Sequence, residues 1–393
     1  TGTLDKCNNW FSQFGLKGSS VVWQDRAATN VGIYQKIYDK GYIDVTSHSK
    51  THAILTDATS PAQREAELAG ARNALRTMFP GQEVLTFAPS NNKMDSTSAE
   101  MCRDTFWTVR KGKQGYNSIN PPENGIGGWY DLKIQGAHQP LDRNNVSCGL
   151  NDILDEALTE TSWLIEMYHS IDAGGDDTLP VTDSAAASHF KKMGQLQNEG
   201  KIWSASFNEV TKYIRERQNT VLTDIATDTS RTVTLQMDTK KLPPEVFNYP
   251  LTVRSQVPEA WAADGKYVKV TQGASVQAPI VKNVDGGLYV YYDAVPTNGV
   301  IILESTTEQP VVKELELNLD NLKFTENGAK NIVHNNNYSK ADASCNTYID
   351  DIRVYEPRSL SMAGPNTPLP VNGIAKMQLS KYIYGFEIGR ASC

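Results

Sequence analysis

The chain has 393 residues, with 38 Lys and Arg against 45 Asp and Glu, which gives a formal net charge of −7. A hydrophobic content of 39% excludes a disordered chain, the mild acidity argues against a nucleic-acid partner, and no apolar run approaches the ~20 residues of a membrane helix. This length predicts two or three domains. Five scattered cysteines exclude a disulfide scaffold and leave at least one thiol free.

Helical and strand patterns alternate over residues 1–220. Apolar residues at helical spacing predict helices at residues 4–14, 30–39, 60–78, 98–105, 153–160, 185–199 and 208–217. Buried strands are expected at residues 19–23, 42–46, 82–87, 162–168 and 202–204. Strands separated by helices predict an α/β fold with a parallel sheet or barrel.

The pattern changes near residue 220. Residues 221–310 show short runs of alternating β-branched and aromatic residues separated by turn signals, which predict an antiparallel β-sandwich. Residues 311–393 contain further strand-like runs and a proline-rich stretch. We expect this β-rich tail to be a partial carbohydrate-binding module, since one run resembles the final strand of such modules.

Two histidines, His48 and His52, directly follow the strand expected at 42–46. Four residues apart, they are expected on one face of a helical turn, where both imidazoles can hold one divalent cation. The alternative is a pair of surface or capping histidines. A third histidine, His169, ends the strand expected at 162–168 and is predicted at the same edge of the sheet, either as a general acid or as a packed residue.

Together these stretches resemble the NodB-homology polysaccharide deacetylases, carbohydrate esterase family 4. The segment from His48 to His52 resembles the second motif of that family, His169 the fifth, and residues 86–91 and 127–131 stand where the third and fourth are expected. Residues 201–217 resemble the last strand and helix of its esterases. The resemblance covers about residues 1–220 and implies a distorted (β/α)7-type barrel.

The resemblance also implies a secreted or periplasmic enzyme that removes acetyl groups from a polysaccharide such as acetylxylan or a chitooligosaccharide. His48, His52 and an aspartate would hold a divalent metal, with zinc expected, and His169 would protonate the leaving group. Contacts to the sugar are expected from two groups of residues. They are Pro89, Ser90 and Asn91 in the third motif, and Arg110, Trp129 and Tyr130 beyond it.

The Asp-Asp-Gly motif that supplies the base and the third ligand in this family is missing. The chain begins without Met, and Thr1–Leu4 resemble residues that follow that motif, so we expect a barrel without its first strand. Asp25, after the first predicted strand, is the best substitute as ligand or base, although a helix-capping role suits it better. Two hypotheses follow: a deacetylase, impaired by this loss, or a glycan-binding protein that keeps the groove without the reaction.

Overall fold

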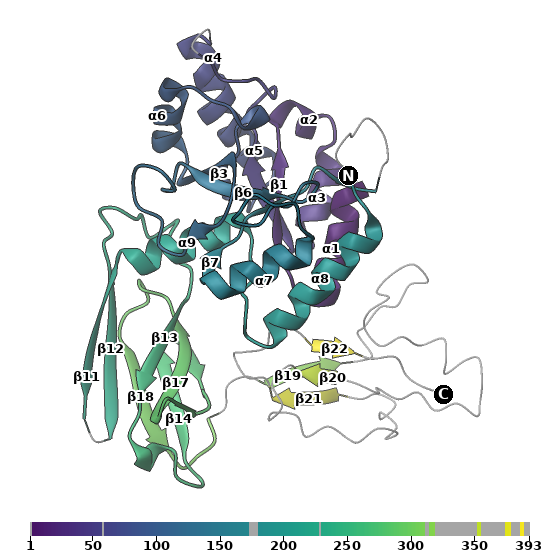
Figure 1. The fold of residues 1–393 in the computed structure, drawn as a ribbon. Coiled ribbons are helices and arrows are strands. Elements are labelled where there is room, and N and C mark those ends of the chain that lie inside the picture. The colour runs from purple at the N-terminus through teal and green to yellow at the C-terminus, as the bar shows by residue number, and fades with distance from the viewer. Residues whose placement is uncertain are drawn as a thin grey trace, which may run out of the picture. The chain divides into compact units, whose positions relative to one another are not determined.

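The computed structural model describes residues 2–56, 59–172, 180–227 and 229–310, and beyond them four short strands as backbone only. The chain divides into two compact units (Figure 1). The first extends to Asn219 and also includes Thr239–Tyr249, a segment that the sequence assigned to the sandwich. The second contains Thr220–Asp238 and the strands that follow Pro250.

Six parallel strands form the sheet of the first unit, in the order β1-β2-β3-β4-β6-β8. They are β1 (Gly18–Val22), β2 (Ile43–Ser47), β3 (Thr86–Phe87), β4 (Thr108–Gln114), β6 (Leu132–Gly136) and β8 (Glu166–Met167). Each pairs with its neighbour in parallel, and helices follow most of them along the chain. The expected α/β fold with a parallel sheet is therefore confirmed.

Except for Gln24–Ala28, where none was predicted, the helices fall close to their predicted positions. They are α1 (Gly2–Phe14), α2 (Gln24–Ala28), α3 (Val31–Tyr38), α4 (Pro61–Glu65), α5 (Ala71–Met78), α6 (Ser96–Thr105), α7 (Leu150–Glu160), α8 (Asp183–Asn198) and α9 (Phe207–Gln218). Ser60 caps α4 through a capping box with Gln63, as a Ser-Pro start predicts. Between α4 and α5 lies a π-helical turn, η1 (Ala66–Gly70), which the sequence did not predict.

Three predicted strands differ from the structure. The strand expected at 82–87 shortens to β3, and residues 202–204 form no strand. The run expected at 162–168 breaks into β7 (Ser162–Trp163), which pairs with β5 (Asn117–Ser118), and β8. Within β8, Glu166 Oε1 lies 2.9 Å from Nε2 of His189 in α8.

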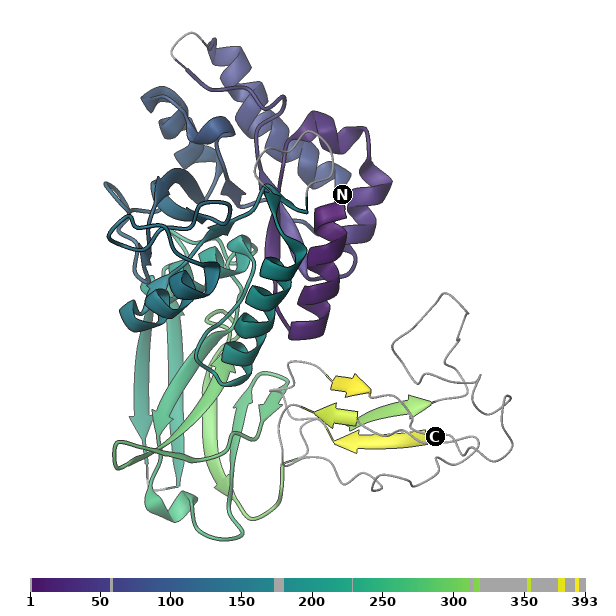
Figure 2. The same ribbon diagram turned by 45° about the vertical axis from the view of Figure 1, so that its right-hand side comes forward.

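Helices α1 and α8 lie side by side (Figure 2). A Cβ placed on Gly194 of α8 would come within 2.7 Å of the Phe14 Cβ of α1. Only glycine therefore allows this close approach. Phe190 fills the adjoining space and packs edge-on against Phe11, with ring centres 5.3 Å apart. The contact joins helices that are more than 160 residues apart in the sequence.

Between Thr220 and Thr306 the second unit contains two antiparallel sheets, as predicted for a sandwich-like domain. One contains β11 (Thr220–Ala226), β12 (Ser230–Met237), β14 (Tyr267–Gln272), β15 (Ser275–Gln277) and β18 (Ile301–Thr306); the other contains β13 (Leu251–Gln256), β16 (Lys282–Val284) and β17 (Gly287–Ala294). Alternate residues such as Val233, Val270 and Tyr292 form one buried core.

In the tail, β19 (Glu314–Asn318) pairs with β21 (Ile374–Gln378), and β20 (Ile352–Val354) pairs with β22 (Phe386–Ile388). The predicted carbohydrate-binding module otherwise lies outside the described residues. No helix in the described part of the chain has the length and hydropathy needed to cross a bilayer.

Candidate functional site

The carboxyl ends of the parallel strands carry the candidate site. The loop after β2 is fixed against the loop after β1 by backbone hydrogen bonds, from the Gln24 amide to the Ser49 carbonyl and from the Asp25 amide to the Lys50 carbonyl, both 3.0 Å. The Ala88 amide, after β3, donates to the Ser47 carbonyl at 3.0 Å. Since neighbouring strands end together, the side chains that follow them gather at one rim.

His48 and His52 meet at this rim, but not on the helical turn that their spacing predicted. The segment is an irregular loop in which Ser49 and His52 adopt left-handed φ angles of 70° and 65°. The loop nevertheless brings the two rings to a centre-to-centre distance of 4.7 Å. Trp23, after β1, packs against His52 with ring centres 4.8 Å apart.

Glu67 holds this loop in place. Its Oε2 accepts hydrogen bonds from the amides of Lys50 (2.8 Å) and Thr51 (2.9 Å), and its Oε1 accepts one from the Thr51 hydroxyl (2.6 Å). Burial raises the pKa of Glu67, but these donors outweigh it and leave the pKa below its usual value. Glu67 belongs to the π-helical turn η1, and such turns are frequent at functional sites.

Sequence reasoning missed Glu67. The available signal was a carboxylate beside Leu68 on the face of a helix that is otherwise buried. A charged residue at a buried position usually has a specific partner. The partner itself could not be inferred, because the π turn that aims Glu67 at the loop leaves no mark in the apolar spacing.

The environment of His48 keeps its imidazole neutral. Burial, together with the nearby Arg110, His52 and His169, lowers the pKa of His48 to about 4, although the hydrogen bond to the Ala88 carbonyl raises it. His48 Nδ1 lies 2.5 Å from the Ala88 carbonyl oxygen, so Nδ1 carries the proton and Nε2 keeps its lone pair. This is the arrangement in which proteins present histidine to a metal.

The histidine pair fits a divalent ion in geometry. With Zn–N bonds of ~2.0–2.1 Å and a tetrahedral angle, two imidazole ring centres bound to one ion lie roughly 5 Å apart. The observed 4.7 Å matches this spacing. Catalytic zinc sites have three protein ligands, however, and no three His, Cys, Asp or Glu side chains in the described residues are grouped to hold a metal.

Asp25 therefore does not join His48 and His52 in a three-ligand group. It is an exposed residue in the first turn of α2, where a carboxylate interacts favourably with the helix N-terminus. The role of Asp25 as third ligand, and with it the predicted catalytic role, thus has no support in the geometry. The N-cap position of α2 is taken by Trp23, so Asp25 does not cap the helix either.

His169 follows β8 and lies exposed at the same rim, near enough to His48 to affect its pKa. Its ring centre is 5.4 Å from that of His138, which the sequence analysis gave no role. The Ala137 amide donates to the Met167 carbonyl at 2.9 Å, and this bond aligns the ends of β6 and β8. Four histidines therefore gather at the rim, where the sequence predicted three.

The third-motif loop follows β3 as expected. Ser90 is buried, with its hydroxyl 3.4 Å from that of Ser49, whereas Asn91 is exposed with a φ of 49°. Pro89 is buried, so Asn91 is the member of this loop that solvent reaches most easily. Arg110 of β4 is only 6% exposed and donates a hydrogen bond to Asn92 in the same loop. Arg110 thus fixes the loop rather than reaching into solvent.

The assignment of Trp129 and Tyr130 to substrate binding is wrong. They precede β6, so they lie at the opposite end of the sheet from the histidines. Trp129 is 1% exposed and Tyr130 is 8% exposed, and both belong to the hydrophobic core. The Arg215 guanidinium lies 4.3 Å from the centre of the Trp129 ring. The residues that end β6 at the rim are instead Gly136 to His138.

Known proteins resemble this chain only in part. No family model matches the chain. A gellan lyase from Bacillus sp. is 22% identical to this chain over 283 residues. The match covers 68% of this chain but 11% of the gellan lyase, so the chain spans about a tenth of the length of this curated relative. Among solved structures, a carbohydrate esterase family 4 pseudoenzyme from Bacillus anthracis is 12% identical, covering 53% of this chain and 60% of its own, with a TM-score of 0.36. A family 4 carbohydrate esterase from Streptomyces lividans is 16% identical, with coverages of 52% and 85% and a TM-score of 0.35.

Proposed function

We propose that this chain binds an acetylated polysaccharide at the histidine rim and hydrolyses its acetyl groups. The observation that carries the proposal is the His48–His52 pair, with rings 4.7 Å apart and His48 Nδ1 bonded to the Ala88 carbonyl. A bound divalent ion, with zinc expected, would polarise the acetyl carbonyl and acidify a water. The similarity to gellan lyase supports a polysaccharide as partner. Acetylxylan and chitooligosaccharides remain the candidate substrates, and the protein would act outside the cytoplasm, secreted or periplasmic.

In this proposal the chain's own residues have separate tasks. His48 and His52 present imidazole nitrogens, and Glu67 keeps their loop in shape through three hydrogen bonds. His169, exposed at the rim, is positioned to donate a proton to the departing sugar oxygen or nitrogen. Asn91 and the neighbouring loop form the accessible wall beside them.

The test is acetate release from acetylated xylan and from chitooligosaccharides, with zinc, with cobalt and after chelation. We expect release that depends on the metal and is lost in His48→Ala. The variant Asp25→Asn is the matched carboxylate control, because Asp25 lies outside any ligand group and its loss should leave the rate within about twofold. The absence of metal-dependent release on every acetylated glycan would refute the proposal.

A second candidate is a glycan-binding protein that does not hydrolyse. The observation that favours it is the absence, among residues that the structure describes, of a carboxylate that completes the ligand set. It predicts retarded migration in gels containing xylan or chitin oligomers without acetate release. Normal migration in every gel would contradict it, whereas retardation together with release would favour the enzyme.

A further inference from the structure

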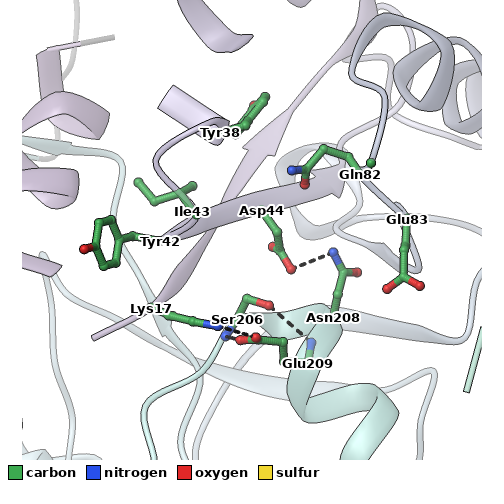
Figure 3. Close-up of a pocket in the computed structure, with 12 residues that line it drawn as sticks. Lys17, Tyr38, Tyr42, Ile43, Asp44, Gln82, Glu83, Ser206, Asn208 and Glu209 are labelled. Carbon is green, nitrogen blue, oxygen red and sulfur yellow. Dashed lines mark hydrogen bonds and ion pairs between the residues drawn. The ribbon is translucent and has the colours of Figure 1, made fainter. Parts of the chain in front are cut away.

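A polar cavity lies at the end of the sheet opposite the histidine rim. Its volume is about 180 Å³, and it lies where β1 and β2 begin and where α9 starts. The lining is rich in hydrogen-bonding side chains (Figure 3). Its polar members are Lys17, Tyr38, Tyr42, Asp44, Gln82, Glu83, Ser206, Asn208 and Glu209.

The walls of the cavity are held rigidly. Asp44 accepts hydrogen bonds from the Ser19 hydroxyl (2.5 Å) and from Asn208 Nδ2 (2.8 Å), and Figure 3 shows Asp44 and Asn208 pointing toward one another. On the open side, Lys17 Nζ is 2.5 Å from Glu209 Oε1, and these two side chains are 42% and 21% exposed. A preorganised polar cavity of this kind loses little entropy when it binds a ligand.

Three aromatic rings form an aromatic cluster, which we define as Trp203, Tyr213 and Tyr249. The centre of the Trp203 ring is 5.0 Å from that of Tyr213 and 6.1 Å from that of Tyr249. Trp203 is 46% exposed, while the two tyrosines are half-buried beside it. An exposed indole backed by two rings offers an apolar surface with polar groups at its edge, which is the arrangement that aromatic residues contribute to binding sites.

The cavity and the aromatic cluster adjoin one another. Glu209 of the cavity and Tyr213 of the cluster are one turn apart on α9, so they share a face of the helix. Ser204, next to Trp203, accepts a hydrogen bond from the Lys17 amide and donates one to the Lys17 carbonyl, both 3.3 Å. All these residues belong to the first unit.

The charges along this surface are balanced. Lys17 pairs with Glu209, and Lys212 Nζ pairs with Glu83 Oε1 at 3.0 Å. Two further charged groups have opposite signs: Asp44 in the cavity lining, and Arg217, whose guanidinium lies 5.9 Å from the centre of the Tyr213 ring. A surface with paired charges gives no preference to an anionic polymer, so its occupant is expected to be uncharged.

We propose that this cavity and the aromatic cluster form a second polysaccharide-binding site, which takes an uncharged sugar chain. One sugar fills the cavity and hydrogen-bonds to Lys17 and Glu209, and a neighbouring sugar stacks its apolar face on Trp203. The site lies at the other end of the sheet from the proposed reaction, so it anchors polymer without contributing to hydrolysis. Its existence does not depend on the activity proposed for the rim.

The experiment is isothermal titration calorimetry of the full chain with xylohexaose, which is uncharged and carries no acetyl groups for the rim. Acrylamide quenching of tryptophan fluorescence provides a second readout. We expect at least a tenfold weaker association constant in Trp203→Ala and partial recovery in Trp203→Phe. The control Ile33→Ala removes a side chain with the same 46% exposure from α3 and should bind normally. His48→Ala should also bind normally.

Three outcomes would overturn the inference. They are unchanged xylohexaose binding in Trp203→Ala, binding of polygalacturonate as tight as that of xylohexaose, and a change of oligomeric state in Trp203→Ala without loss of sugar binding. Acetate release tests the rim separately. Binding that depends on Trp203 in a chain that releases no acetate would support this site while refuting the proposed hydrolysis.

Discussion

Asn208 joins the start of α9 to the middle of the parallel sheet, and its removal should destabilise the first unit strongly. The side chain is 4% exposed. Its Nδ2 donates to Asp44 Oδ2 (2.8 Å) and to the Val45 carbonyl (3.1 Å), and its Oδ1 accepts from the Leu85 amide (3.1 Å). Asn208→Ala leaves the buried Leu85 amide and the Asp44 carboxylate short of a partner. At about 1–3 kcal/mol for each such group, the free energy of unfolding should fall by about 4 kcal/mol.

The effect should also depend on pH. Burial raises the pKa of Asp44 to about 6, although hydrogen bonds from Ser19, Ser206 and Asn208 lower it. The folded carboxyl therefore holds its proton to higher pH than the unfolded one, and the free energy of unfolding falls as pH rises through 6. Without the Asn208 donor the charged form is stabilised less, so the loss in Asn208→Ala should be larger at pH 8 than at pH 5.

Urea denaturation followed by tryptophan fluorescence provides the assay. Six of the seven tryptophans lie in the first unit, because Trp261 alone belongs to the second, so the signal reports on the barrel. Asn198→Ala, at the exposed end of α8, is the matched control and should change the free energy of unfolding by less than about 0.5 kcal/mol. A loss below about 1 kcal/mol in Asn208→Ala at pH 8 would refute the reasoning.

Three further predictions follow. Burial is the main reason that the pKa of His48 is lowered to about 4 in the folded chain. As pH falls, His48 therefore takes up a proton in the unfolded chain before it does so in the folded chain. The free energy of unfolding should drop by about 3 kcal/mol between pH 6.5 and 4. His48→Gln should flatten that part of the urea-derived curve, and an unchanged slope would contradict the assignment. Burial raises the pKa of Glu216 to about 7, and its Oε2 has no hydrogen-bond partner. The folded chain therefore favours the protonated carboxyl, and the stability that this form contributes is lost as pH rises through 7. Glu216→Gln should therefore unfold at higher urea than the native chain at pH 8.5; a lower midpoint would argue against a protonated Glu216. Glu67→Gln should weaken zinc binding in calorimetry by about 10–100-fold, because Glu67 supports the loop that carries the metal ligands. Glu65→Gln, at an exposed position, should leave zinc binding unchanged. Equal zinc affinities in the two variants would exclude this role for Glu67.

The sequence predicted the fold of the first unit well because its signals are local. The capping box at Ser60, the helical apolar spacing and the strand at Ile43–Ser47 each depend on a few adjacent residues. The length of a strand depends on its neighbours instead. Val84 and Leu85 are apolar enough to extend this strand. The Leu85 amide instead donates to Asn208 and the Gln82 side chain accepts from the Val45 amide, so only Thr86–Phe87 pair with the sheet.

The rule that polar residues after parallel strands share one edge explains both the success and the failure at the site. It placed His48 and His169 correctly at one rim because the ends of β2 and β8 were recognised. The assignment of Trp129 failed because it rested on a match to a family motif rather than on this rule, and Trp129 precedes β6. The strand β6 was not predicted from the sequence. Had β6 been located, the same rule would have directed attention to His138, whose buried Nδ1 has no hydrogen-bond partner and whose ring lies beside that of His169. The reliability of a motif match in a parallel sheet therefore depends on knowing where each strand ends.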